Sequence, residues 1–213
     1  VLNRILRHNL RNETTVIRGY AELLEADVTD TTHAMQAGTI AAASNRLESI
    51  AEKAGSFDSL QERIRQPEVL SVSELIAEVE QTYSATHSEA SIDWTGAASE
   101  LHFRTDRVLL SMLLENLIEN AIIHAEAAEP TVRITVSEPA TPNKDVRLEI
   151  RDNNEPIPEQ EIETLRAGEE TPLQHGQGIG LWIVYWCLDR LNGSIEFDYD
   201  GGNVLKVALP ELT

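Results

Sequence analysis

The sequence predicts an α+β chain in two parts, a helical hairpin followed by an α/β sandwich domain. Residues 33–66 carry a seven-residue apolar repeat, which indicates a long helix with a coiled-coil-like seam. After Pro67 short alternating apolar runs are mixed with helical patterns. Such a mixture, without regular strand-helix-strand alternation, is typical of helices packed on one face of a mixed sheet. We therefore expect the hairpin at residues 1–66 and the sandwich at residues 71–213.

The first helix of the hairpin has the same apolar pattern. It runs through Leu6, Leu10, Ile17, Tyr20 and Leu24. The stretch "DVTDTT" then supplies turn and N-cap residues. The apolar stripe is wider than one partner helix can cover, so we expect a homodimer whose two hairpins form a four-helix bundle. Because the sequence opens on Val1 inside a helical pattern, we also expect it to be a piece of a longer chain.

Helices and strands of the second part follow in a mixed order. "SVSELIAEVEQTY" opens with a capping box, Ser71 with Glu74, and predicts a helix. Further helices are predicted over 106–126, begun by Thr105 or Asp106, and over 179–191. The predicted strands are "SIDW", "TVRITV", "VRLEI", "SIEFDY" and "NVLKVAL".

The composition restricts the partners of this chain. Its 36 acidic and 17 basic residues give a net charge of -19, which repels nucleic acid and anionic membranes. We expect neither as a partner, and we interpret the charge as adaptation to concentrated salt, that is, as halophilic. The single Cys187 favours a reducing, cytoplasmic compartment. No apolar run reaches the roughly 18 residues of a membrane span, so we expect no membrane contact by this fragment, whatever anchors the parent chain.

A histidine stands on the outer side of the first predicted helix, in "LRHNLRN". With Leu10 at heptad position a and Leu6 at d, His8 falls at the outermost position, f. One interpretation is an ordinary solvated histidine. The other is an imidazole that attacks a phosphoryl group brought by a large partner. The second interpretation requires a nucleotide site elsewhere in the chain.

Alternate glycines introduce the last predicted helix. In "HGQGIGLWIV" the glycines are Gly176, Gly178 and Gly180, and they let backbone N–H groups and a helix N-terminus approach a polyphosphate. A simple tight turn is the alternative. We reject a dinucleotide-binding fold because a polar loop, not a strand, precedes the glycines.

The helix over 106–126 carries a polar stripe at its apolar edge. Asn116, Asn120 and His124 are spaced i, i+4, i+8. Amides at the edge of a core cost free energy unless they are satisfied, and an amide oxygen can join the ligands of a phosphate-bound Mg²⁺. Structural capping is the alternative.

A carboxylate ends the predicted strand in "VRLEIRDNNEPIP". Val146, Leu148 and Ile150 alternate inward, so Asp152 continues on the inward face. There it could accept a hydrogen bond from the exocyclic amine of adenine. The alternative is an aspartate that starts a turn.

Together, "RHNLRN", "ENLIENAIIHA", "DNNEPIP" and "GQGIGLWIV" resemble, in order, the H, N, G1 and G2 boxes of the sensor histidine kinases of two-component systems. The acidic composition and "LRHNLRN" resemble the haloarchaeal branch. The resemblance implies a dimerisation and phosphoacceptor hairpin followed by a catalytic ATP-binding domain of the type shared with gyrase and Hsp90. It implies ATP-dependent autophosphorylation and phosphotransfer to an aspartate of a response-regulator receiver domain.

The resemblance also implies a role for each candidate residue. His8 would be the phosphoacceptor and Asn12 would orient a water that removes phosphate from the regulator. Asn120 would bind Mg²⁺, while Asp152 would read adenine. The remaining nucleotide-binding residues would be Asn116 and His124 in the pocket, with Gly176, Gly178, Gly180 and Leu181 in the lid hinge and phosphate cradle.

Four positions depart from the family pattern. Asn9 stands where an acid usually follows the phosphoacceptor, and it cannot act as a base. Asn154 and Pro156 replace both glycines of the first glycine box, and Ile123 replaces a basic residue. Because Pro156 fixes φ, we expect this loop to take a different course and ATP affinity to be weakened. These departures motivate a second hypothesis, a dimeric signalling scaffold that binds partners without kinase activity.

Overall fold

The computed structural model describes residues 14–24, 31–61, 63–96, 101–125, 129–137, 145–166 and 179–212. The chain divides into two compact units. The first holds the described residues up to Ile64 together with Ile179, and the second holds those from Arg65 onward. Each unit is described by itself.

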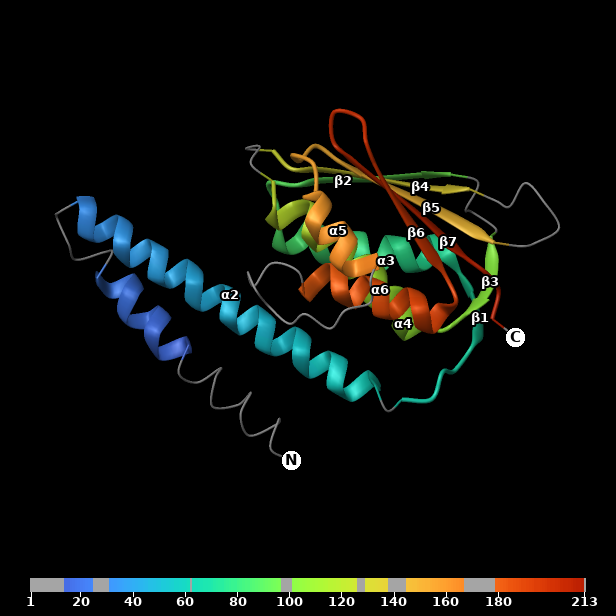
Figure 1. Ribbon diagram of the computed structural model, residues 1–213, viewed down its shortest axis with the longest axis horizontal. Coiled ribbons are helices and arrows are strands. Elements are labelled where there is room, and N and C mark those ends of the chain that lie inside the picture. Colours follow the sequence, from blue (N-terminus) through green and yellow to red (C-terminus); the bar gives the residue numbers. More distant parts are fainter. Residues whose placement is uncertain are drawn as a thin grey trace. The chain divides into compact units, whose positions relative to one another are not determined.

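The first unit is helical. Residues 14–24 form one helix, and α2 (Thr31–Gln61) forms the other. They lie side by side (Figure 1), and Arg18 Nη1 donates to Asn45 Oδ1 at 3.1 Å and to Glu48 Oε2 at 2.6 Å. The dimeric four-helix bundle stays a prediction.

Small side chains of this unit are buried, whereas many large apolar ones face solvent. The buried residues are Thr14, Ala21, Ala37, Ala41, Ser44 and Ala51. The exposed residues include Ile17, Tyr20, Leu24, Ile40 and Leu47, all of which belong to the predicted apolar seam. The two helices therefore leave an apolar face that the described residues of this unit do not cover.

The second unit contains a five-stranded sheet and a separate two-stranded ribbon. The sheet consists of β2 (Ser91–Gly96), β4 (Thr131–Ser137), β5 (Val146–Asp152), β7 (Asn203–Leu209) and β6 (Ser194–Tyr199), in that spatial order. Only β2 and β4 are parallel. The ribbon pairs β1 (Glu68–Ser71) with β3 (His102–Thr105). The predicted mixed α/β fold is confirmed, but β1 and β3 were not predicted.

Helices cover one face of the sheet (Figure 1). They are α3 (Val72–Thr86), α4 (Arg107–Ile123) and α6 (Ile179–Leu191). The short α5 (Glu159–Arg166) follows β5 and was not predicted. The alternating Val146, Leu148 and Ile150 of β5 are buried as predicted, so the core lies between the sheet and these helices.

Two side chains cap the N-termini of α3 and α4. Ser71 caps α3 by accepting from Glu74 N at 3.4 Å. Asp106, not Thr105, caps α4: its Oδ1 accepts from Val108 N at 3.1 Å and from Leu109 N at 3.2 Å. None of the described helices combines the length and the apolar character that a membrane crossing needs.

Candidate nucleotide site

Two amides of α4 are buried without full satisfaction. Asn116 is 5 % exposed, and its Nδ2 donates back to Met112 O at 2.8 Å. Among the described residues, Asn116 Oδ1 and Asn120 Nδ2 have no hydrogen-bond partner. A buried polar atom without a partner costs about 1–3 kcal/mol, so these two atoms are candidates for contact with a ligand.

Gly180 meets Asn120 at the start of α6. A Cβ atom added at Gly180 would lie 2.5 Å from Asn120 Oδ1. Only glycine therefore lets the backbone of α6 approach the Asn120 amide without displacing it. This contact brings Gly180, the last glycine of the second glycine box, to the middle of the predicted polar stripe.

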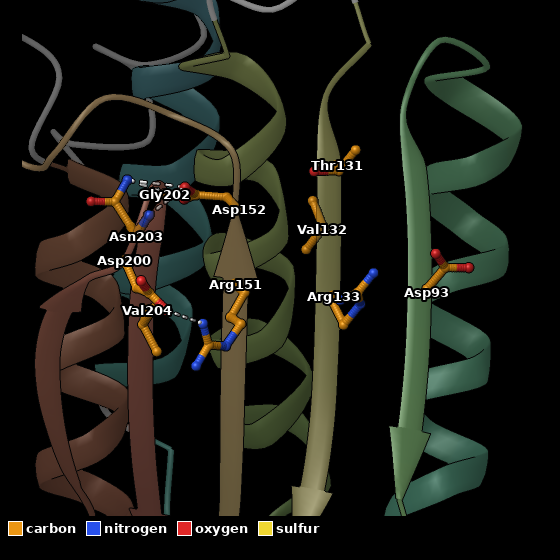
Figure 2. A pocket seen from close by; sticks show the side chains of 10 residues that line it. All are labelled: Asp93, Thr131, Val132, Arg133, Arg151, Asp152, Asp200, Gly202, Asn203 and Val204. Carbon is orange, nitrogen blue, oxygen red and sulfur yellow. Dashed lines mark hydrogen bonds and ion pairs between the residues drawn. The ribbon is translucent and has the colours of Figure 1, made fainter.

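Asp152 ends β5 and is tightly hydrogen-bonded. Its Oδ1 accepts from Asn154 N at 3.0 Å and from Asn203 N at 2.9 Å. The side-chain Nδ2 of Asn203 adds donations of 3.1 Å to Oδ1 and 3.3 Å to Oδ2. Figure 2 shows Asp152 and Asn203 reaching toward each other from neighbouring strands. The carboxylate is thereby fixed in one orientation.

The altered first glycine box is anchored by side-chain amides. Asn154 is 7 % exposed, and its Nδ2 donates to Ala121 O of α4 at 2.9 Å. Its Oδ1 is a further buried atom without a partner among the described residues. Asn153 ties the same loop to the start of β4, since it accepts from Thr131 N at 2.9 Å and donates to Glu129 O at 3.2 Å. The loop after Asp152 is therefore attached next to Asn120.

The structure brings four of the predicted site residues into one region of the second unit. They are Asn116, Asn120, Asp152 and Gly180, connected through the contacts above. His124 is the C-cap residue of α4 and is exposed, whereas Leu181 is 6 % exposed and belongs to the core. His8, Asn12, Gly176 and Gly178 lie outside the described residues.

A shallow cavity lies on the other, open face of the sheet. Its volume is about 220 Å³, and Arg133 and Arg151 project into it between Asp93 and Asp200 (Figure 2). Ligand pockets for drug-sized molecules usually measure at least about 300 Å³. Asp152, Gly202 and Asn203 also line this cavity. The unsatisfied amide atoms of Asn116 and Asn120 belong to α4, which covers the opposite face of the sheet, so we do not assign the nucleotide to this cavity.

Asn203 was missed by sequence reasoning. It is 5 % exposed and is the first residue of β7. After "DGG" an asparagine is expected to be a turn residue, so its pairing with Asp152, 51 positions away, could not be predicted. The one available signal was an asparagine at the start of an apolar strand, where this residue type is depleted.

Cys187 belongs to α6 and is fully buried. Burial first, and then the charges of Asp106 and Glu115, raise the pKa of its thiol to about 12. The thiol therefore stays protonated near neutral pH, and it is a core side chain, not a nucleophile.

Comparisons with known proteins identify the family and several relatives of this chain. The model of the histidine kinase-, DNA gyrase B- and HSP90-like ATPases matches residues 105–213. The chain is 25 % identical to the sensor protein DegM of Bacillus sp. (strain B21-2), over 96 % of the chain and 52 % of DegM. It is 28 % identical to the sensory histidine kinase/phosphatase NtrB of Vibrio alginolyticus, over all of the chain and 62 % of NtrB. The chain thus spans about half to two thirds of the length of these relatives.

Solved structures of the histidine kinase ThkA share the fold. The ThkA catalytic domain superposes with a TM-score of 0.59 at 25 % identity, covering 68 % of this chain and 96 % of the domain. A second ThkA structure, in complex with the response regulator protein TrrA, gives a TM-score of 0.65 at 24 % identity, covering 99 % of this chain and 61 % of ThkA. With half of its residues matched by the family model, the chain belongs to the histidine kinase-, DNA gyrase B- and HSP90-like ATPases.

Proposed function

We propose that this chain is the core of a two-component sensor histidine kinase, which binds ATP with Mg²⁺, phosphorylates His8 and passes the phosphoryl group to an aspartate of a response regulator. The observation that carries the proposal is the cluster of buried, unpartnered amide atoms on Asn116, Asn120 and Asn154 beside Asp152, in a chain of this ATPase family. Nucleotide binding would satisfy these atoms and remove their cost.

The nucleotide would be held from both ends. Asp152 would accept from the exocyclic amine of adenine, and Asn116, Asn154 and His124 would contribute polar groups to the pocket. Gly176, Gly178 and Gly180 with Leu181 would bring backbone N–H groups to the phosphates.

Asn120 would be the protein ligand of Mg²⁺. Among the described residues, no three His, Cys, Asp or Glu side chains gather as a metal site. Magnesium in phosphoryl-transfer sites commonly uses one or two protein ligands plus phosphate oxygens, so a single amide oxygen fits this ion. When bound, Mg²⁺ supplies neutralisation of phosphate charge.

The reaction would be a direct phosphoryl transfer. A ring nitrogen of His8 forms a bond to the γ-phosphorus, the bond between that phosphorus and the bridging oxygen breaks, and ADP leaves with the electron pair. The proton of the other ring nitrogen passes to solvent, since Asn9 carries no base. In the second step a carboxylate oxygen of the regulator would bond to phosphorus, the nitrogen–phosphorus bond would break, and the ring would take a proton back from solvent, which restores neutral His8. Asn12 would orient the water of any later hydrolysis.

The rest of the arrangement is part of the same proposal. Residues 1–66 would form the dimerising phosphoacceptor hairpin and residues 71–213 the catalytic domain, working at the cytoplasmic side in a salt-adapted organism. Two relatives are named as sensor proteins or histidine kinases, and ThkA is crystallised with a response regulator. These names support the partner class proposed here.

Incubation with γ-³²P-labelled ATP and Mg²⁺ tests the proposal. We expect acid-labile label on the chain that disappears in His8→Gln, and loss of saturable nucleotide binding in Asn120→Ala. Label that persists after His8→Gln would refute the phosphoacceptor. Absence of both label and saturable, Mg²⁺-dependent ATP binding would instead favour a signalling scaffold, which family membership alone does not favour.

A further inference from the structure

We propose that Asn203 is a positioning residue that sets base specificity: it holds Asp152 so that one carboxylate oxygen is left to accept from the 6-amino group of a purine. This inference rests on the proposed nucleotide site and adds a residue to it. The hydrogen bonds around Asn203 are the observations that carry it.

Every polar atom of the Asn203 side chain is used. Its Nδ2 donates to both oxygens of Asp152 and to Glu155 O at 3.0 Å. Its Oδ1 accepts from Ile157 N at 3.0 Å. With 5 % exposure, the side chain is shielded from competing water. Asn203 therefore joins the carboxylate to two backbone groups of the loop that follows it.

The two oxygens of Asp152 are left in different situations. Oδ1 accepts from Asn154 N, Asn203 N and Asn203 Nδ2, all within 3.1 Å. Within the part of the chain that the structure describes, Oδ2 receives only the longer 3.3 Å donation from Asn203. A carboxylate oxygen has about two acceptor positions, so Oδ1 is saturated and Oδ2 can take another donor. Oδ2 can accept a hydrogen bond from the 6-amino group of a purine. The carbonyl oxygen of a 6-oxo base would instead place its lone pairs against those of Oδ2.

The backbone around Asn203 makes this contact possible. A Cβ atom at Gly202 would lie 2.0 Å from Asp152 O, so only glycine allows β7 to begin this close to the end of β5. That approach lets Asn203 N reach the Asp152 carboxylate. An asparagine is suited to the position because it combines a donor for Asp152 with an acceptor for Ile157 N.

The same contacts account for a loop that lacks its usual glycines. Asn203 holds Glu155 and Ile157 on either side of Pro156, while Asn153 and Asn154 attach the start of the loop to β4 and α4. Side-chain amides thus fix the loop backbone at the positions where glycines are replaced. A fixed acceptor discriminates bases more strongly than a mobile one, since a site built to bind an N–H group loses most from an analogue without it.

Competition binding on the full chain tests the inference, with ATP and its 6-oxo analogue ITP displacing a fluorescent ATP analogue. We expect the wild type to prefer ATP, and Asn203→Ala to reduce the ratio of ATP to ITP affinity at least tenfold, mainly by weakening ATP. Asn203→Asp has nearly the same shape but no amide donor, so it should reduce the ratio similarly and serves if the alanine variant fails to fold. Lys206→Ala is the matched control, because it removes an exposed side-chain contact of the same strand, with Asp198, without touching Asp152 or its loop, and its ratio should stay unchanged.

The outcomes separate the two proposals. A wild type without saturable ATP binding overturns the proposed nucleotide site. A wild type that prefers ATP, together with an unchanged ratio in both Asn203 variants, overturns the role of Asn203 alone. Equal losses for ATP and ITP in these variants also overturn it, since a purely structural residue would weaken both nucleotides alike.

Discussion

Asp106 is a fully buried carboxylate at the junction between the linker and α4. Besides capping α4, its Oδ2 accepts from Gln66 N at 2.7 Å. It therefore joins the segment before β1 to the helix that carries Asn116 and Asn120. Hydrogen bonds to a charged acceptor contribute more than neutral ones, so this single side chain holds both elements.

Replacing Asp106 by alanine should lower the free energy of unfolding by about 2–3 kcal/mol, because the variant leaves three N–H groups, one buried and two partly buried, without this acceptor. Urea unfolding measures the change. Ser71→Ala is the matched control, since Ser71 caps α3 through one long bond and its loss should cost less, about 1 kcal/mol. Equal losses in the two variants would contradict this account.

The raised pKa of the Cys187 thiol predicts that the folded chain loses stability at alkaline pH. Its pKa is raised to about 12 in the folded chain, above the ordinary value of about 8.5 of an unfolded thiol. Below pH 8 both states are protonated and the thiol has no effect. As the pH rises further, only the unfolded state ionises, so stability falls until the folded pKa is reached.

Between pH 8 and 10.5 the Cys187 contribution amounts to about 2 kcal/mol of lost stability. Cys187→Ala should therefore lose about 2 kcal/mol less than the wild type over this interval, although it is less stable at pH 8 because of the cavity it creates. Urea unfolding at both pH values measures the difference. Parallel pH profiles would show that the thiol ionises without unfolding.

Contact between α6 and α4 depends on Gly180. Gly180→Ala would place a methyl group against the Asn120 amide, so Asn120 must move away from its position in the site. We expect ATP binding to weaken about tenfold while the thermal unfolding midpoint changes little. Gly19→Ala is the control, since nothing lies within 4 Å of its added Cβ. Unchanged ATP affinity in Gly180→Ala would show that Asn120 does not bind through its present rotamer.

At the scale of helices and strands, local periodicity predicted most elements. The pairings between residues far apart in the sequence could not be predicted. α4 and β5 were predictable because burial imposes repeats of 3.6 and 2 residues on their side chains. β1 and β3 have four residues each, too few for a pattern, and their pairing joins Glu68 to Thr105. The site divides in the same way: Asn116 and Asn120 share one helix face, whereas the bond between Asp152 and Asn203 depends on strand order.

The net charge of -19 predicts that salt stabilises the whole molecule. The Debye length falls from about 10 Å at 0.1 M to about 3 Å at 1 M salt, which screens repulsion between acidic groups. Surface pairs such as Lys206 with Asp198 are weakened by the same screening, but acidic residues outnumber basic ones by about two to one. The thermal midpoint should rise by about 5 °C between 0.1 and 2 M KCl. Sucrose at matched water activity is the control, and a flat or falling midpoint in KCl would contradict salt adaptation.

The exposed apolar residues of the first unit predict a homodimer. Tyr20 is 68 % exposed and Ile40 is 46 % exposed, and large apolar side chains gathered on helices that a chain leaves uncovered mark an interface. Light scattering after size exclusion should give twice the protomer mass for the wild type. Ile40→Glu should give the protomer mass while keeping ATP binding, because Asn116, Asn120 and Asp152 all belong to the other unit. Val69→Glu changes an exposed apolar residue of β1, in the other unit, and should remain dimeric. A wild type that is monomeric at micromolar concentration, or an Ile40→Glu variant that stays dimeric, would contradict the proposed interface.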